Sequence, residues 1–171
     1  MKRLAIITAA ITLFLSGCNC QSDKKDESGQ ASKAESQDVK KEYAQTVKPV
    51  HLTKQTFLEE IVDYEANPNE WIYKGELPSL IDFYADWCRP CKITSPILEE
   101  LAEEYAGQIN IYKVDVQNER ELAAVFGVQS IPTFLYIPKN DNPVISSGIA
   151  NTPEATKIMF REQIDKLLLQ K

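Results

Sequence analysis

The stretch "DFYADWCRPCK", residues 82–92, contains two cysteines, Cys88 and Cys91, that are separated by two residues and preceded by a tryptophan. It continues from "SLIDFYA" (79–85), a short apolar run typical of a strand that is covered on both faces. Beyond it, apolar residues recur every four positions, which predicts a helix from about Cys91 to Gly107 with Pro96 inside it. We therefore expect the cysteine pair at a strand-to-helix junction.

Three kinds of site are compatible with two cysteines at this spacing. A zinc site needs about four ligands, and the chain has one histidine, His51, and two other cysteines, Cys18 and Cys20, near its N-terminus. A structural disulfide would close a very short loop, which stabilises least in the chain-entropy model. A redox pair is favoured by position, because the amide groups and dipole at a helix N-terminus stabilise a Cys88 thiolate, and Cys91 can resolve a mixed disulfide. We expect His51 to be an ordinary surface or strand-edge residue.

The segment from about Val47 to Lys171 alternates strand-like and helix-like patterns. With 43% apolar residues in 171, the chain has enough material for one domain with a core. The other expected elements are a lead-in strand (47–52), a helix capped by Thr53, a strand (109–116), a helix (119–126), a strand (133–137), a strand in "PVISSG" (143–148) and a final helix opened by Pro153. In the final helix we expect Ile158, Met159, Ile164 and Leu167 to face inward.

The first 18 residues, "MKRLAIITAAITLFLSGC", have the pattern of a secretory signal, with a basic start, an apolar run from Leu4 to Leu15 and a small-residue exit. The run is shorter than the about 20 residues that cross a bilayer, so it predicts export. The sequence Leu-Ser-Gly-Cys at 15–18 resembles the lipobox of bacterial lipoproteins, which implies cleavage before Cys18 and lipidation of this cysteine. The alternative is an ordinary cleavable signal with a cysteine nearby by chance. Cys20 matches no lipobox.

Residues 21–42 consist almost entirely of Ser, Lys, Asp, Glu and Gln, and contain no aromatic residue. Such a segment cannot bury enough surface to offset its chain entropy, so we interpret it as a tether with a reach of roughly 30 Å. The predicted organisation is a signal peptide at 1–17, a lipidated cysteine and disordered tether at 18–46, and a folded domain at 47–171. After removal of 1–17, 17 basic and 25 acidic residues give a formal charge of −8, which disfavours nucleic acid as a partner.

The motif "WCRPCK" (87–92) resembles the active-site signature of the thioredoxin family, and the similarity extends over most of residues 47–171. Upstream, "LIDFYAD" resembles the family's central strand. Downstream, Pro96 matches a helix proline, "SIPTFLYI" (130–137) matches the segment with a cis-proline, and Gly148 matches a glycine near the last strand. Four features in the right order are far more specific than one Cys-x-x-Cys. The resemblance implies a thioredoxin fold, an α/β fold of three layers (α/β/α) with a central mixed sheet.

The resemblance also implies roles for individual residues. Cys88 would be the exposed nucleophile and Cys91 the buried resolving thiol, and the two would form the redox-active disulfide. Asp82 would be the buried carboxylate beneath the cysteines, a position that its apolar surroundings in "SLIDFY" also favour, since burial raises a carboxyl pKa toward a range useful for proton transfer. Lys113 would be the lysine beside this acid, with an ordinary snorkelling side chain as the alternative.

Further roles concern the surroundings of the cysteines. Trp87 would flank the site, and Pro132, following Ile131 in a cis bond, would form the backbone platform that pairs with substrate as an added strand. Asp82, Pro90 and Ile131 favour the reducing branch of the family, because dedicated oxidases usually replace them.

Two features depart from the family. Arg89 occupies a position that is usually glycine, and its guanidinium should stabilise the Cys88 thiolate and raise the redox potential above the roughly −270 mV of thioredoxin itself. The segment at 66–79 is longer than usual, and Trp71 and Tyr73 within it either cover the core or belong to a partner surface.

Together these features predict a thiol-disulfide oxidoreductase that reduces protein disulfides outside the cytoplasm through Cys88 and Cys91. We expect a monomer without metal, flavin or nucleotide, held in the periplasm or at the cell surface by a lipid anchor and recharged by a membrane-borne thiol reductant. The alternatives are a disulfide-donating oxidase or isomerase of the same fold, and a non-catalytic binding or holding module.

Overall fold

The computed structural model describes residues 47–171, so Cys18, Cys20 and the segments predicted to be a signal peptide and a tether lie outside the described residues. Within 47–171 the chain forms a five-stranded sheet with the order β1-β3-β2-β4-β5. The strands are β1 (Val50–His51), β2 (Ser79–Tyr84), β3 (Asn110–Asp115), β4 (Thr133–Ile137) and β5 (Val144–Ser147). The helices are α2 (Lys54–Glu60), α3 (Arg89–Glu104), α4 (Arg120–Val125) and α5 (Pro153–Gln163), which continues into a π-helical turn, η1 (Ile164–Leu168). The predicted order of elements is confirmed.

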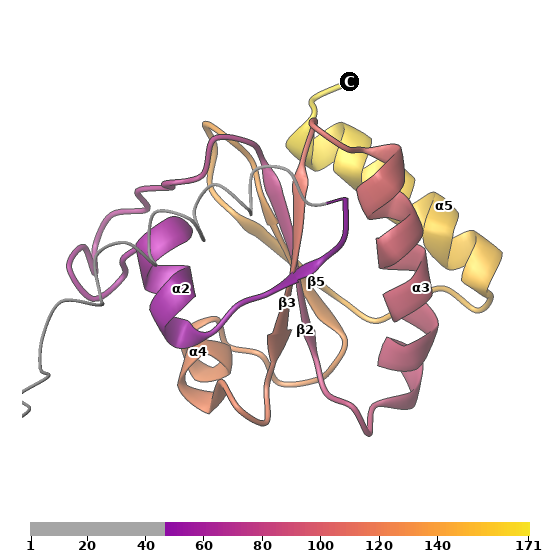
Figure 1. Ribbon diagram of the computed structural model, residues 1–171, viewed down its shortest axis with the longest axis horizontal. Coiled ribbons are helices and arrows are strands. Elements are labelled where there is room, and N and C mark those ends of the chain that lie inside the picture. The colour runs from indigo at the N-terminus through magenta and orange to yellow at the C-terminus, as the bar shows by residue number, and fades with distance from the viewer. Residues whose placement is uncertain (1–46) are drawn as a thin grey trace, which may run out of the picture. The chain divides into compact units, whose positions relative to one another are not determined.

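Helices cover both faces of the sheet, as Figure 1 shows, with α2 and α4 on one side and α3 and α5 on the other. Each face has its own core cluster. Side chains alternate along a strand, so in β2 Leu80 belongs to the cluster beneath α3 and α5, whereas Ile81 and Phe83 belong to the cluster beneath α2 and α4. We call these the α3 face and the α2 face. The predicted three layers are thus present.

The sheet is mixed, as predicted, because β1 and β2 run parallel to β3 while β4 runs antiparallel to β2 and β5. The register aligns one row of side chains across it: His51 lies opposite Lys113, Lys113 opposite Asp82, and Asp82 opposite Phe134. Residues directly opposite each other point to the same face. This row therefore runs on the α3 face from the edge strand to the centre of the sheet.

Local sequence signals set the ends of two helices. The Thr53 hydroxyl accepts a hydrogen bond from the Thr56 N–H, and the Thr56 hydroxyl accepts one from the Thr53 N–H, which closes a capping box at α2 as the predicted cap requires. Helix α3 ends before Gly107, whose φ of +73° is a left-handed conformation that glycine adopts without strain.

The inward face of the last helix matches the prediction except at Ile158. Ile164 is buried, and Met159 and Leu167 are partly buried against the core cluster of the α3 face, whereas Ile158 is 53% exposed. Contact with the sheet, where Phe160 packs edge-to-face on Phe134, fixes which side of the helix is buried. Sequence periodicity alone did not exclude Ile158 from that side.

The segment at 66–79 lies over the α2 face. Trp71 and Tyr73 both pack against that core cluster, and the Trp71 ring meets Phe126 edge-on at 6.2 Å. The first of the two interpretations, that these aromatic residues cover the core, is confirmed. Among the helices of residues 47–171, none has the length and apolarity that a membrane crossing requires.

Candidate functional site

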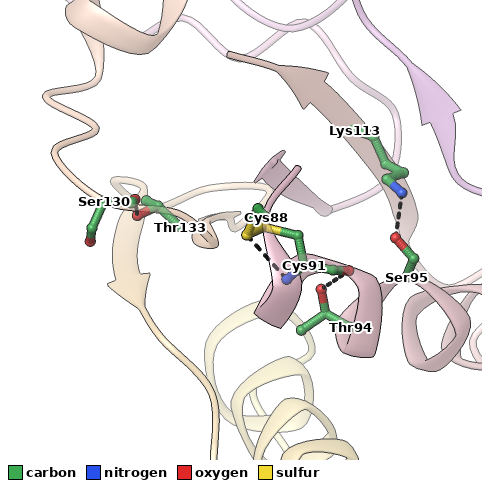
Figure 2. The surroundings of a disulfide bond; sticks show 7 residues. All are labelled: Cys88, Cys91, Thr94, Ser95, Lys113, Ser130 and Thr133. Atoms are coloured by element: carbon green, nitrogen blue, oxygen red, sulfur yellow. Dashed lines mark hydrogen bonds between the residues drawn. A yellow bond between two sulfur atoms is a disulfide. The ribbon is translucent and has the colours of Figure 1, made fainter. Parts of the chain in front are cut away.

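The cysteine pair lies where β2 leads into α3. Cys88 is the N-cap residue of α3, and its Sγ accepts a hydrogen bond of 3.2 Å from the Cys91 N–H. Pro90 lies in the first turn of α3, where backbone N–H groups have no partner within the helix, so the missing N–H of proline costs no helical hydrogen bond. The two sulfurs are joined in a disulfide, with Cα atoms 5.3 Å apart (Figure 2). In the reduced state the same amide groups and helix dipole would favour a thiolate at Cys88.

The expectation that Cys88 is exposed is wrong for this oxidised form. Cys88 is 3% exposed and Cys91 is 1% exposed, so both sulfurs are buried. The reason is that the disulfide packs into a small cluster with Ala85, against which Ile131 also packs. Exposure at this end of the molecule comes from Trp87 instead, whose side chain is 66% exposed, and from the neighbouring Arg89.

The segment that leads into β4 also packs against the disulfide, through Ile131. The Ile131–Pro132 peptide bond is cis, as the resemblance implied. The Pro132 carbonyl accepts a hydrogen bond from the Gly148 N–H (3.0 Å), and the Thr133 hydroxyl donates to the Ser130 carbonyl (2.7 Å; Figure 2). Within residues 47–171, Ile131 itself makes no backbone hydrogen bond.

Asp82 is fully buried on the α3 face, as its apolar context predicted. Neither carboxyl oxygen has a hydrogen-bond partner among the described residues. Burial raises the pKa of Asp82 to about 7, while the nearby Lys113 ammonium acts in the opposite direction. A carboxyl group with such a pKa can accept or release a proton near neutral pH.

Lys113 is Asp82's neighbour in the sheet, but its side chain turns toward α3. Its ammonium donates a hydrogen bond of 2.8 Å to the Ser95 hydroxyl (Figure 2). The same ammonium lies 4.4 Å from the centre of the Tyr84 ring. The Tyr84 hydroxyl in turn lies 3.3 Å from His51 Nδ1. Ser95 and Tyr84 were not among the site residues predicted from the sequence. Each had a usable spacing signal, since Tyr84 lies two residues after Asp82 in a strand and Ser95 lies four residues after Cys91 in a helix, but neither spacing indicates a contact with Lys113.

These polar side chains surround a surface cavity of about 230 Å³ behind the cysteine pair. His51 stands on the exposed edge strand, as expected; burial by its neighbours, followed by the effect of Lys113, lowers the pKa of its imidazole. Within residues 47–171, no three His, Cys, Asp or Glu side chains are placed to hold a metal ion. The cavity is lined by His51, Tyr84, Ala85, Asp86, Cys91, Lys92, Ser95 and Lys113.

Comparison with known proteins gives concordant results. A family model described as thioredoxin matches residues 48–160. A thioredoxin of Borreliella burgdorferi is 44% identical over 99 residues, which cover 58% of this chain and 84% of that protein. A thioredoxin of Haemophilus influenzae is 38% identical over 92 residues, covering 54% and 84% respectively. Among solved structures, a mutant thioredoxin from Halobacterium salinarum aligns with a TM-score of 0.54 and 25% identity, over 72% of this chain and 93% of the other.

Proposed function

This chain belongs to the thioredoxin family, and from that premise we propose that it reduces protein disulfides outside the cytoplasm through Cys88 and Cys91. The fold is the thioredoxin fold, and thiol-disulfide oxidoreduction is the general activity of the family. The observation that carries the proposal is the Cys88–Cys91 disulfide at the N-terminus of α3, beside the cis Ile131–Pro132 bond.

The proposed exchange begins from the reduced dithiol. The Cys88 thiolate attacks one sulfur of a substrate disulfide, forms a mixed disulfide and releases the first substrate sulfur as a thiolate. The Cys91 thiol then passes its proton to the Asp82 carboxylate and attacks Cys88 Sγ, which releases the second substrate thiolate. Two electrons thus move from the dithiol to the substrate, and the Cys88–Cys91 disulfide remains.

Asp82 fits the role of proton acceptor on physical grounds. An exposed aspartate, with an ordinary pKa of about 3.9, is too weak a base to take a proton from a thiol efficiently near pH 7. The buried Asp82 carboxyl, with its pKa raised to about 7, is a much better match. Lys113 is next to it in the sheet and is proposed to tune this group.

The proposed substrate surface surrounds the exposed Trp87. An extended peptide would pair with the free backbone groups of Ile131, beside the buried cis-proline, while the indole ring covers it from the other side. Backbone pairing of this kind carries little sequence preference, which suits a reductant of many proteins. Arg89, exposed at the first position of α3, would contact the substrate or stabilise the Cys88 thiolate.

The proposed direction of electron flow is toward the substrate. Asp82, Pro90 and Ile131 support a reducing member of the family. Arg89 is proposed to make the redox potential of the Cys88–Cys91 couple somewhat more oxidising. The disulfide-donating alternative predicts a potential close to the roughly −120 mV of a strong oxidant. Equilibration of the full chain against glutathione separates these two functions, because a potential nearer to −270 mV supports the reductant and one near −120 mV supports the oxidase.

The proposed location rests on the sequence of the first 18 residues. A signal sequence followed by Cys18 supports export and lipid anchoring, and a membrane-borne thiol reductant would then return electrons to the disulfide. Cys18→Ala should move the protein from the membrane fraction to the soluble fraction, with Cys20→Ser as the matched control that stays bound. Equal membrane association of the Cys18→Ala variant would contradict the anchor.

Substitution of the two active-site cysteines tests the chemistry. Cys88→Ser should abolish the reduction of insulin disulfides, because Cys88 at the N-cap of α3 is the proposed attacking sulfur and Cys91 the resolving one, whereas Cys20→Ser should reduce insulin like the unaltered chain. Cys91→Ser should accumulate mixed disulfides with substrates in cells, which mass spectrometry can identify. Retained activity of Cys88→Ser in cells would instead support a binding or holding module.

A further inference from the structure

The charged groups around Asp82 are arranged in an unexpected way. The only cation among the described residues that influences its titration is Lys113, which is its partner in the sheet register. A lysine so placed would ordinarily pair with a buried carboxylate, since an unpaired buried charge is costly. Within residues 47–171, neither Asp82 oxygen has a hydrogen-bond partner, and the Lys113 ammonium donates to Ser95 instead.

Ser95 is well placed to hold the lysine. It lies four residues after Cys91 in α3 and therefore on the same side of the helix, facing the cavity that Cys91 and Lys113 also line. The Tyr84 ring forms the second contact to the ammonium, at 4.4 Å, and the tyrosine hydroxyl is itself within 3.3 Å of His51. The lysine is thus held from two sides, and neither contact involves Asp82.

We propose that Ser95 is a positioning residue whose hydroxyl holds the Lys113 ammonium away from Asp82, so that this carboxylate stays basic enough to take the proton of Cys91. The proposal rests on the proposed function, in which Asp82 is the proton acceptor. A direct Asp82–Lys113 ion pair would favour the ionised carboxylate and lower its pKa by about one to three units. The acceptor would then be too weak near neutral pH.

Other groups that face Asp82 do not compete for this role. Tyr136 comes from β4 and Tyr84 from β2 itself, and both are neutral phenols at pH 7 whose pKa values are raised by burial. Helix α3 contributes Cys91, and α5 contributes Phe160 and its continuation Ile164 to the core on this face. Lys113 is therefore the cation whose position decides how readily Asp82 ionises.

The test measures Asp82 directly in the full chain, kept in detergent micelles. Carboxyl carbons are labelled with ¹³C, Asp82 is assigned from the Asp82→Asn spectrum, and its titration midpoint is read by NMR. In Ser95→Ala the freed ammonium should move to the carboxylate, and the midpoint should fall by at least about one pH unit. The resolving step at neutral pH should slow by up to about tenfold for each pH unit of that fall, because a one-unit change in pKa is a tenfold change in the proton equilibrium.

Three control variants separate positioning from other effects. Ser95→Thr keeps the hydroxyl and should restore the midpoint. Lys92→Gln removes another cation that lines the same cavity and should move the midpoint far less than Ser95→Ala. In a Lys113→Met background, Ser95→Ala should produce no further shift, because the proposed effect acts only through the lysine.

The proposal is overturned if the Ser95→Ala midpoint is unchanged or rises, or if the shift persists in the Lys113→Met background. A shift of the midpoint without any change in the pH dependence of the resolving step would support the positioning of Lys113 and refute Asp82 as the proton acceptor of the proposed function. The experiment therefore distinguishes failure of the positioning role of Ser95 from failure of Asp82 as the proton acceptor.

Discussion

The two faces of the sheet are built by the same strands but hold different chemistry. The core cluster on the α2 face consists of aliphatic and aromatic side chains, and Phe57, Ile61, Phe83 and Leu122 in it are fully buried. The α3 face also has an apolar core, but it carries the row of His51, Lys113 and Asp82 and is covered by the helix that begins at the cysteines.

This difference shows how a single sheet separates stability from reactivity. Side chains of strand β2 alternate between the two faces of the sheet. Ile81 and Phe83 lie on the α2 face, whereas Asp82 lies on the α3 face. An apolar face stabilises the domain by removing surface from water. The buried, unpaired carboxylate on the other face opposes stability at neutral pH and is tolerated for the reaction that we propose.

The largest expected effect on stability comes from the α2 face. Phe57→Ala should lower the free energy of unfolding by about 3–5 kcal/mol, because it removes a fully buried ring that contacts Phe126 and Tyr64. Urea denaturation gives the change, and Ile158→Ala, at an exposed position, is a control that should change stability by less than about 0.5 kcal/mol. The Asp82 titration midpoint of the folded Phe57→Ala variant should be unaltered; a large shift would show that the two faces are not independent.

A pH-dependent effect of similar size is expected from the α3 face. Folded Asp82 holds its proton until about pH 7, whereas an unfolded aspartate releases it near about 3.9, so between these values the folded state binds more protons. The contribution of Asp82 to the free energy of unfolding should therefore be greatest below about pH 4 and fall as pH rises toward 7, by up to about 4 kcal/mol.

Asp82→Asn should remove that fall, because an amide has no proton to lose. The variant should be more stable than the unaltered chain at pH 8 and should exchange disulfides more slowly near neutral pH. Urea denaturation at pH 5 and pH 8 checks the first point, and Asp86→Asn, an exposed neighbour, serves as the control. If the Asp82→Asn variant loses as much stability between these pH values as the unaltered chain, ionisation of Asp82 does not cause the fall in the free energy of unfolding.

The smallest expected effect comes from outside both cores. Arg89→Gly should make the redox potential more negative by about 10–20 mV, on a scale where a tenfold change in the equilibrium is about 30 mV, because the exposed guanidinium can stabilise the Cys88 thiolate only weakly. Equilibration with glutathione measures the shift, and it should diminish at high salt. An unchanged potential would remove any role for Arg89 in tuning the couple.

Much of the site followed from the sequence because its signals are local. The spacing of Cys88 and Cys91, the apolar run that contains Asp82, and the cap at Thr53 each depend on neighbours within a few residues. What failed, or was missed, depended on neighbours distant in sequence. Ile158, predicted to face the core, faces solvent because contact with the sheet fixes which side of α5 is buried. The burial of Cys88 depends on packing with Ala85, Cys91 and the distant Ile131.

The sequence by itself determined the order of elements, the position of the cysteines at a helix start and the burial of Asp82, since periodicity, capping and apolar context are written along the chain. Only the tertiary structure decided where the Lys113 ammonium goes. Its bond to Ser95 joins a strand to a helix 18 residues away, and a side chain with several rotatable bonds selects its partner by what folding brings within reach, which no linear pattern records.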